Sequence, residues 1–216
     1  GQIHKELAGK TALLGFAGSP WTLANYMIEG GSTSEFVRAH QLRKEEPKLF
    51  EQLMSKLTRS IIDYLKMQVD SGVDAIQIFD SMGGMLSSEE YSEVSGRWIG
   101  EIIESLDGMV PVILFSRDTA GSLQELVQTG AQVLGLDWSI RLSEARSRVP
   151  NSIALQGNLD PTVLTTTPET AARETSRILE EMRGNNGFIF NLGHGVPPDA
   201  KLENIESVVS VVKGFK

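Results

Sequence analysis

A histidine between two glycines is the first candidate for chemistry in this sequence. His194 lies between Gly193 and Gly195, directly after residues 187–191, an apolar run typical of a short strand. Glycine lets the backbone approach a bound group closely, and an imidazole can donate or accept a proton near neutral pH. We expect His194 to lie at a ligand-binding turn; a capping histidine in a tight turn is the alternative.

Two hydroxyl-bearing side chains are the next candidates. Tyr26 precedes the pair Gly30-Gly31, and its phenol could contact a carboxylate or take part in a proton transfer. Ser81 follows a buried run and precedes a glycine pair, so its hydroxyl could bind a ligand. The alternatives are a half-buried packing tyrosine and a serine that caps a turn.

Acidic and amide side chains follow the other strand-like runs. Asp80 directly precedes Ser81 and is either a turn residue or part of a binding site. Asp118 follows Arg117, and we expect an internal ion pair there rather than a site. Residues 157–161 form a polar corner that we expect to fix loop geometry.

Apolar runs alternate with segments of helical periodicity along the whole chain. Such alternation predicts a parallel sheet, and continuous apolar strands predict burial on both faces. At 122–129, Ser122 and Glu125 have the spacing of a capping box. The predicted strands cover 12–16, 74–79, 110–115, 133–136, 153–156 and 187–191, and the predicted helices cover 46–70, 88–106, 122–129, 142–148, 167–182 and 202–212.

The polar residues gather just after the predicted strands, as in a (β/α)8 barrel, whose catalytic loops meet at the carboxyl ends of the strands. A doubly wound nucleotide-binding fold is less well supported, because residues 15–20 do not match the glycine-rich phosphate-binding pattern. The sequence therefore predicts an α/β fold of the TIM-barrel type. In such a barrel Tyr26, Ser81 and His194 would point into one cleft.

Composition narrows the class of protein. The 216 residues suit a single domain over 1–216, and the net charge of −8 argues against a nucleic-acid partner. The absence of cysteine excludes thiolate metal sites and fits a reducing compartment such as the cytoplasm. No apolar run is long enough to span a membrane and no signal peptide is visible, so we expect no membrane association.

Six motifs in order along nearly the whole chain resemble the uroporphyrinogen decarboxylase family. They are Gly15-Phe16-Ala17-Gly18-Ser19-Pro20-Trp21-Thr22-Leu23, Tyr26-Met27-Ile28-Glu29-Gly30-Gly31, Gln77-Ile78-Phe79-Asp80-Ser81, Gly135-Leu136-Asp137-Trp138, Gln156-Gly157-Asn158-Leu159-Asp160-Pro161 and Asn191-Leu192-Gly193-His194-Gly195. The resemblance implies a single (β/α)8 barrel and a carboxy-lyase (carbon–carbon lyase) of haem and tetrapyrrole biosynthesis. It would remove the four acetate carboxyl groups of uroporphyrinogen III to give coproporphyrinogen III without a cofactor or a metal.

Matched by motif, the family's substrate-contacting tyrosine falls on Tyr26, its serine or threonine on Ser81, and its histidine on His194. The resemblance thus implies that Tyr26 and His194 are catalytic, and that all three residues bind a small tetrapyrrole. The resemblance is compatible with a homodimer.

The sequence departs from the family pattern at its N-terminus. Family members begin with a segment resembling Met-Arg-Gln-Ala-Gly-Arg, followed by a strand with an essential aspartate, and neither occurs here. With six strand candidates we expect about six of the eight β/α units and an N-terminally incomplete barrel. Asp80 and Asp118 are then the first candidates to replace the missing aspartate.

Two other functions stay open. The chain could be a catalytically incomplete fragment, or one that depends on a partner. A related corrinoid- or coenzyme M-linked methyltransferase barrel is less well supported, because those enzymes hold zinc with cysteines and this chain has none.

Overall fold

The structure is a computed structural model that describes residues 2–7, 9–31 and 36–215. The chain divides into two compact units, which we call unit 1 (residues 1–132) and unit 2 (residues 133–216). Each unit is described by itself. The expectation of a single domain over residues 1–216 stays a prediction.

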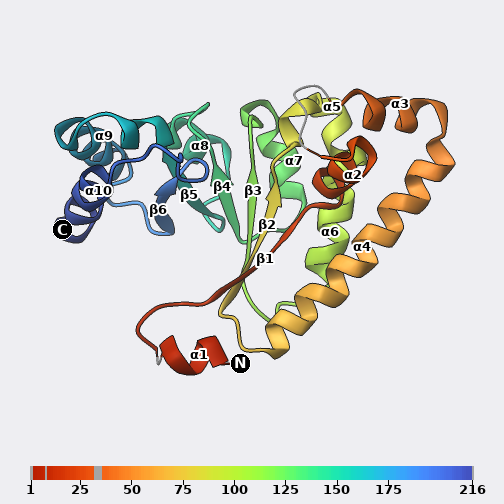
Figure 1. Cartoon of the computed structure of the whole chain (residues 1–216), viewed down its shortest axis with the longest axis horizontal. Coiled ribbons are helices and arrows are strands. Elements are labelled where there is room, and N and C mark those ends of the chain that lie inside the picture. The colour runs from red at the N-terminus through yellow and green to blue at the C-terminus, as the bar shows by residue number, and fades with distance from the viewer. Residues whose placement is uncertain (1, 8, 32–35, 216) are drawn as a thin grey trace. The chain divides into compact units, whose positions relative to one another are not determined.

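Unit 1 contains three parallel strands in sequence order (Figure 1). They are β1 (Leu14–Gly18), β2 (Ala75–Asp80) and β3 (Val112–Ser116). Gly18 pairs with Phe79 and Asp80 pairs with Ser116, so the strands end at a common level. The side chains that follow the three strands therefore share one edge of the sheet.

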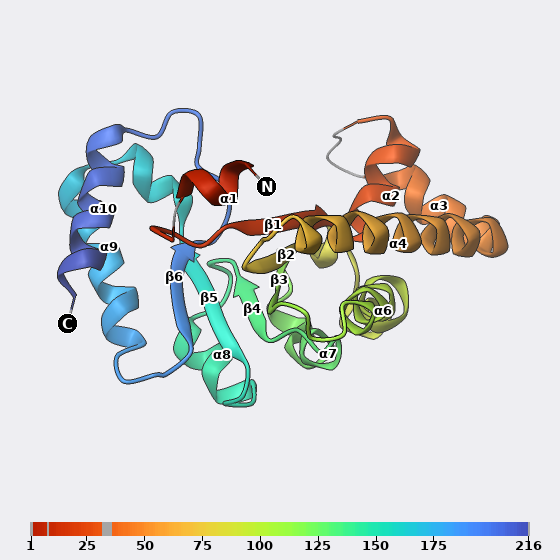
Figure 2. The same ribbon diagram turned by 90° about the horizontal axis from the view of Figure 1, so that it is seen from below.

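Helices cover one face of these strands. The long amphipathic helix α4 packs along β1, β2 and α6, on the same side of the strands as α6 (Figure 2). Gly15 faces α4 so closely that a Cβ atom there would lie 2.5 Å from Gln68 Oε1. The helical segments of unit 1 are α1 (Gln2–Leu7), α2 (Pro20–Glu29), α3 (Val37–Glu45), α4 (Pro47–Asp70), η1 (Gly83–Met85), α5 (Ser88–Tyr91), the π-helical turn η2 (Ser92–Gly96), α6 (Arg97–Ser105), η3 (Ala120–Ser122) and α7 (Leu123–Gln128).

Unit 2 repeats the pattern with three more parallel strands, again in sequence order. Helices α9 and α10 pack side by side (Figures 1 and 2). Thr167 caps the amino end of α9, because its side chain accepts a hydrogen bond from Thr170 N. The elements are β4 (Val133–Leu136), α8 (Leu142–Arg148), β5 (Ala154–Leu159), η4 (Pro161–Thr165), α9 (Pro168–Glu181), β6 (Phe188–Leu192) and α10 (Leu202–Gly214).

Parallel strands that alternate with helices confirm the predicted α/β class. Each predicted strand is found within three residues of its expected bounds, and the strand at 133–136 and the helix at 142–148 match fully. Closure into a barrel stays a prediction. Within the described ranges, no helix is long and apolar enough to cross a membrane.

One local prediction was wrong. Ser122 precedes α7, but its side chain makes no capping hydrogen bond to that helix. Its hydroxyl instead lies 3.2 Å from Ser88 Oγ, because the preceding 3-10 turn η3 directs it toward α5. The capping box expected from Ser122 and Glu125 is therefore absent.

Candidate functional site

A buried carboxylate lies at the carboxyl ends of the strands of unit 1. Asp80 is the last residue of β2, and its side chain is fully buried. Its Oδ1 accepts a hydrogen bond from Ser19 Oγ at 2.6 Å, and its Oδ2 accepts one from Tyr91 Oη at 2.7 Å. Longer contacts come from Thr22 Oγ1 at 3.4 Å and Ser116 Oγ at 3.3 Å. We call these five residues the Asp80 cluster.

Burial governs the protonation of this cluster. Desolvation raises the pKa of Asp80, and the hydrogen bonds from Ser19 and Tyr91 oppose that rise. Burial and the neighbouring charge of Asp80 raise the pKa of Tyr91 well above its ordinary value. The phenol therefore stays protonated and donates a hydrogen bond to the carboxylate.

The turn after β2 lies against this cluster because it contains two glycines. A Cβ atom on Gly83 would lie 2.3 Å from Ser116 Oγ and 2.7 Å from Asp80 Oδ2. A Cβ atom on Gly84 would lie 2.4 Å from Asp118 Cβ. Only glycine allows so close an approach. The two glycines therefore let the backbone around Ser81 pack against the ends of β2 and β3.

Ser81 and Tyr26, two of the predicted site residues, both belong to unit 1. Ser81 directly follows Asp80 and is half-buried. Tyr26 lies on α2 with about a third of its surface accessible (36%), and its ring meets Phe36 edge-on with centroids 5.7 Å apart. Both side chains retain access to solvent, as contact with a substrate requires.

Aromatic rings line the face of the unit 1 strands that is turned away from α4. Phe16 and Phe79 meet edge-on with centroids 6.1 Å apart, and Phe79 and Phe115 are 5.9 Å apart. Phe16 is 59% exposed although it lies in a strand. The three rings form an apolar cluster that we call the aromatic face, in which Phe16 is exposed and Phe115 is buried. Sequence reasoning missed it. The signal was present for two of the rings, because Phe79 and Phe115 each directly precede the polar last residue of their strand.

In unit 2 the turn that carries His194 contacts the end of β5 and the residues after β4. Gly193 N donates a hydrogen bond to Leu159 O at 2.8 Å. A Cβ atom on Gly193 would lie 2.8 Å from Trp138 Cε3, so the turn packs directly on the residues after β4. His194 itself is exposed, and Trp138 is 42% exposed. An imidazole and an indole are thus both accessible at this edge of unit 2.

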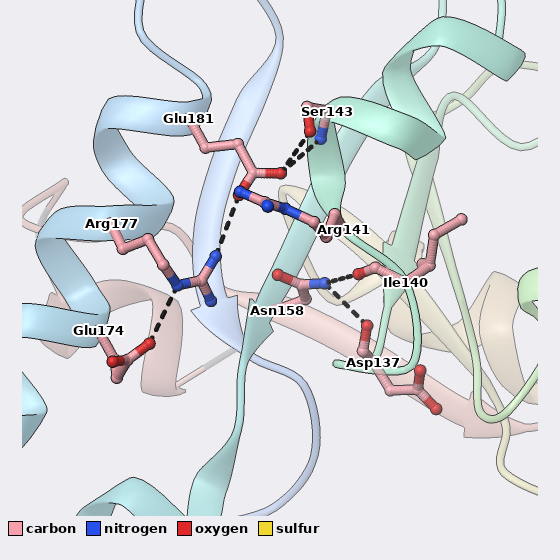
Figure 3. A network of polar contacts seen from close by, with 8 residues as sticks. All are labelled: Asp137, Ile140, Arg141, Ser143, Asn158, Glu174, Arg177 and Glu181. Carbon is pink, nitrogen blue, oxygen red and sulfur yellow. Dashed lines mark hydrogen bonds and ion pairs between the residues drawn. The ribbon is translucent and has the colours of Figure 1, made fainter.

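The polar corner after β5 fixes loop geometry, as expected from sequence (Figure 3). Asn158 Nδ2 donates to Asp137 O at 2.9 Å and to Ile140 O at 2.6 Å. Asp160 Oδ1 accepts from Thr162 N at 2.9 Å and so caps η4. Asn158 therefore holds the segment after β4 in place, which is the segment on which Gly193 packs.

Figure 3 also shows polar and charged residues at the start of α8 and on α9 that serve structure. Glu181 accepts hydrogen bonds from Ser143 N at 2.9 Å and Ser143 Oγ at 2.7 Å. Arg141 and Arg177 both pair with the same carboxylate, at 3.3 and 3.1 Å. With its charges paired in this way, the cluster ties α8 to α9.

The two aspartates proposed to replace a missing one are both engaged elsewhere. Asp80 accepts the hydroxyl hydrogen bonds of its cluster and has no exposed surface. Asp118 pairs with Arg117 at 3.2 Å, which confirms the predicted ion pair, although both side chains are exposed rather than internal. Asp80 is therefore shielded from a bound cation, and Asp118 already pairs with the charge of Arg117.

The structure groups Tyr26 and Ser81 in unit 1 and places His194 in unit 2. That these three residues point into one cleft stays a prediction. Within the described part of the chain, no group of three or more His, Asp or Glu residues lies close enough to hold a metal ion.

Solved structures resemble this chain in fold. A methyltransferase from Methanosarcina mazei matches with a TM-score of 0.85 at 18% identity, over 99% of this chain and 62% of that one. A dihydropteroate synthase from Xanthomonas albilineans matches with a TM-score of 0.54 at 8% identity, over 94% of this chain and 66% of that one. Fold and strand-end residues together define an α/β protein of parallel β/α units with its polar groups at the carboxyl ends of the strands.

The chain belongs to the uroporphyrinogen decarboxylase (URO-D) family, whose sequence model matches residues 1–215. The relative from Pseudoalteromonas translucida, named uroporphyrinogen decarboxylase, is 42% identical over 99% of this chain and 62% of its own length. A protein of the same name from Pseudomonas syringae pv. tomato is 43% identical over 97% of this chain and 61% of its own length. This chain thus spans a little over three fifths of the relatives it matches.

Proposed function

We propose that the protein containing this chain is a uroporphyrinogen decarboxylase, which removes the four acetate carboxyl groups of uroporphyrinogen III to give coproporphyrinogen III. The observation that carries the proposal is the family match over residues 1–215, supported by relatives of that name at more than 40% identity. The reaction belongs to tetrapyrrole and haem biosynthesis.

The chemistry requires an electron sink. When the bond between an acetate methylene and its carboxyl group breaks, the electron pair stays on the methylene carbon and must be delocalised. Protonation of the pyrrole ring provides the sink, because the resulting cation accepts the pair as carbon dioxide leaves. A second proton then converts the methylene to a methyl group, and the ring loses the proton it had gained. Each acetate thus exchanges carbon dioxide for one proton.

The exposed groups at the strand ends fit this chemistry. Phe16, the exposed ring of the aromatic face, offers apolar surface to pyrrole rings. Tyr26 and Ser81 carry hydroxyl groups that can donate hydrogen bonds to substrate carboxylates. His194 can hold a carboxylate or relay a proton, because an imidazole changes charge near neutral pH. We propose Tyr26 and His194 as catalytic residues and Ser81 as a substrate-binding residue.

The cationic intermediate also needs a negative counter-charge close by. Asp80 is enclosed by hydroxyl groups, and Asp118 pairs with Arg117. We propose that the counter-charge, together with arginines for the substrate carboxylates, belongs to a part of the protein outside these 216 residues. The alternative is a chain that is catalytically incomplete or that acts only with a partner.

A cell compartment and a set of binding partners can be proposed as well. We propose a cytoplasmic protein that acts on a small tetrapyrrole without cofactor or metal, does not bind nucleic acid or membrane, and can assemble as a homodimer. The net charge of −8 supports the exclusion of nucleic acid.

The direct test is anaerobic incubation of uroporphyrinogen III with the complete natural polypeptide that contains this sequence. Chromatography of the oxidised porphyrins should show stepwise loss of carboxyl groups ending in coproporphyrin. Addition of a metal chelator should leave the rate unchanged. Absence of any decarboxylated product from the folded, complete polypeptide would refute the proposed function.

A further inference from the structure

The Asp80 cluster joins the three strand ends of unit 1. Asp80 ends β2, Ser19 follows β1, and Ser116 ends β3. Both neighbours reach the same carboxylate, Ser19 at 2.6 Å and Ser116 at 3.3 Å. One side chain therefore accepts hydrogen bonds from both flanking strands, at the edge where the candidate site lies.

The cluster is also connected to both site residues of unit 1. Ser19 is the N-cap of α2, because its Oγ accepts a hydrogen bond from Thr22 N at 3.0 Å, and α2 carries Tyr26. Ser81 is bonded directly to Asp80, and the next residue, Met82, donates its N–H to Thr22 Oγ1 at 3.3 Å. The positions of α2 and of the Ser81 turn thus depend on the same carboxylate.

The fourth side of the cluster is a tyrosine that a helix distortion brings into place. Tyr91 ends α5 and is followed at once by the π-helical turn η2, and its ring is fully buried. Its hydroxyl donates to Asp80 Oδ2 at 2.7 Å and lies 3.4 Å from Ser116 Oγ. A π-turn in a helix is uncommon and often occurs near functional sites.

The composition of the cluster argues against a role in stability alone. Burying a carboxylate costs free energy that an apolar side chain of similar size would avoid. Within the described ranges, no ion pair joins Asp80 to a cation, and its hydrogen-bond donors in the cluster are neutral hydroxyl groups. Such a network fixes geometry, because every donor has a defined direction toward one of two oxygens.

We propose that Asp80 is a positioning residue, which sets the places of Ser81 and of the helix that carries Tyr26 without touching the substrate. The kinetic part of this proposal rests on the proposed function. Its structural part, that the carboxylate holds α2 and the Ser81 turn together, stands without it.

The test compares Asp80→Ala and Asp80→Asn with the matched control Asp74→Ala in the complete natural polypeptide. Asp74 lies just before the other end of β2 and accepts a hydrogen bond from Leu13 N at 2.7 Å. Asp80→Ala should raise the KM for uroporphyrinogen about 10-fold or more, because misplaced groups bind substrate poorly. Asp80→Asn, which keeps one acceptor oxygen, should recover most of that loss, and Asp74→Ala should leave KM within about 2-fold.

A double-mutant cycle separates positioning from general loosening of the fold. If Asp80 acts through Ser81, then Ser81→Ala should have a much smaller effect on KM in the Asp80→Ala background than in the wild type. Additive effects of the two substitutions would overturn the proposal.

Two further measurements make the result decisive. If Asp80→Ala does not fold, Tyr91→Phe removes one donor while keeping the ring, and Tyr64→Phe on the exposed side of α4 is its control.

Hydrogen exchange should accelerate at residues 20–24 and 81–86 in the Asp80 and Tyr91 variants and stay unchanged there in both controls. Unchanged exchange at both segments in the cluster variants would overturn the proposal even if activity fell. A wild-type protein without decarboxylase activity would refute the proposed function instead, and the exchange data alone would then decide the role of Asp80.

Discussion

Glycine residues bring the strand-end turns into contact with neighbouring backbone. At Gly83 a side chain would collide with Ser116 and Asp80, and at Gly193 it would collide with Trp138 and the backbone of Asp137. At Gly157 a Cβ atom would lie 2.5 Å from Leu136 O. Gly83 and Gly193 follow strands and Gly157 lies within β5, so the contacts are needed where the candidate site is built.

Substitution at one of these glycines should therefore destabilise the fold. We expect Gly83→Ala to lower the free energy of unfolding by about 1–3 kcal/mol, the usual cost of overpacking a closely packed site. Gly100 in α6 is the matched control, because its nearest neighbour to a new Cβ atom would be Thr129 O at an ordinary 3.7 Å. Gly100→Ala should be neutral or stabilising by up to about 1 kcal/mol, since alanine favours helix. Urea unfolding of both variants measures the difference, and equal midpoints would contradict the packing argument.

His194 should affect the reaction rather than the fold, because its side chain is exposed in a turn. In the complete polypeptide we expect His194→Asn to lower kcat/KM for uroporphyrinogen by about 10²-fold, the scale typical of a lost acid–base group. Its thermal unfolding midpoint should stay within a few degrees of the wild type. A variant with unchanged kcat/KM would remove His194 from the list of catalytic residues.

Among the elements, α8 depends on a neighbour for its cap. The N-cap residue of α8, Arg141, makes no capping hydrogen bond through its side chain. Glu181 at the end of α9 supplies the missing acceptor, because it receives the N–H of Ser143. The cap thus comes from another helix, and α8 is held to α9 by the same contact.

Removal of this cap should cost stability. We expect Glu181→Ala to lower the free energy of unfolding by about 1–2 kcal/mol, the usual effect of losing a helix cap. The control is Glu180→Ala, since Glu180 is exposed and forms a surface ion pair with Arg183, and it should leave stability nearly unchanged. Denaturant unfolding measures both, and equal losses would show that Glu181 has no special role.

The contribution of Glu181 should also depend on pH. Burial raises the pKa of Glu181, but the hydrogen bonds from Ser143 and Arg141 outweigh it and leave the pKa below its ordinary value of 4.5. A carboxyl group with a lowered pKa in the folded state stabilises above its unfolded pKa, and this stabilisation disappears as pH falls through the folded pKa. The stability difference between the wild type and Glu181→Gln should therefore be constant near neutral pH and shrink below about pH 4.5. A difference that grows on acidification would contradict this assignment.

Sequence patterns predicted the elements that depend on local spacing. The strand at 133–136 is a short run buried at every position, and the helices at 142–148 and 47–70 show apolar periodicity, which reflects burial on a fixed face. The helix α2 was not predicted, although Ser19 as N-cap, Pro20 in the first turn and Gly30 after the end are standard signals. Its apolar and polar residues do not alternate clearly, because both Thr22 and Asn25 are buried.

The Asp80 cluster could not have been assembled from local patterns. Ser19 and Asp80 are 61 positions apart in the sequence, and only the parallel pairing of β1 with β2 brings them together. Sequence reasoning located Asp80 and Ser81 at a strand end but gave no sign that one side chain is buried and the other accessible. That difference arises because Asp80 is the last residue of β2, whereas Ser81 lies in the turn that follows the strand.

At the scale of the whole molecule, charge limits what these 216 residues can do alone. Uroporphyrinogen carries many carboxylates, whereas the chain has a net charge of −8. Arg117 is the arginine that directly follows a strand in unit 1, and it pairs with Asp118. Charge-assisted partners for the substrate carboxylates are therefore scarce at the strand ends described.

We accordingly expect the isolated 216-residue polypeptide to convert uroporphyrinogen III at least about 10²-fold more slowly than the complete natural protein, because each lost preorganised electrostatic group typically costs that much. The measurement is anaerobic turnover of equal amounts of both polypeptides, followed by chromatography, with circular dichroism to show that both are folded. Equal rates would mean that the groups described here provide the counter-charge themselves. In that case Asp80 would have to exchange its hydroxyl partners for the substrate cation, and Asp118 would have to leave Arg117. The substitutions Asp80→Asn and Asp118→Asn would then each abolish the activity of the short chain.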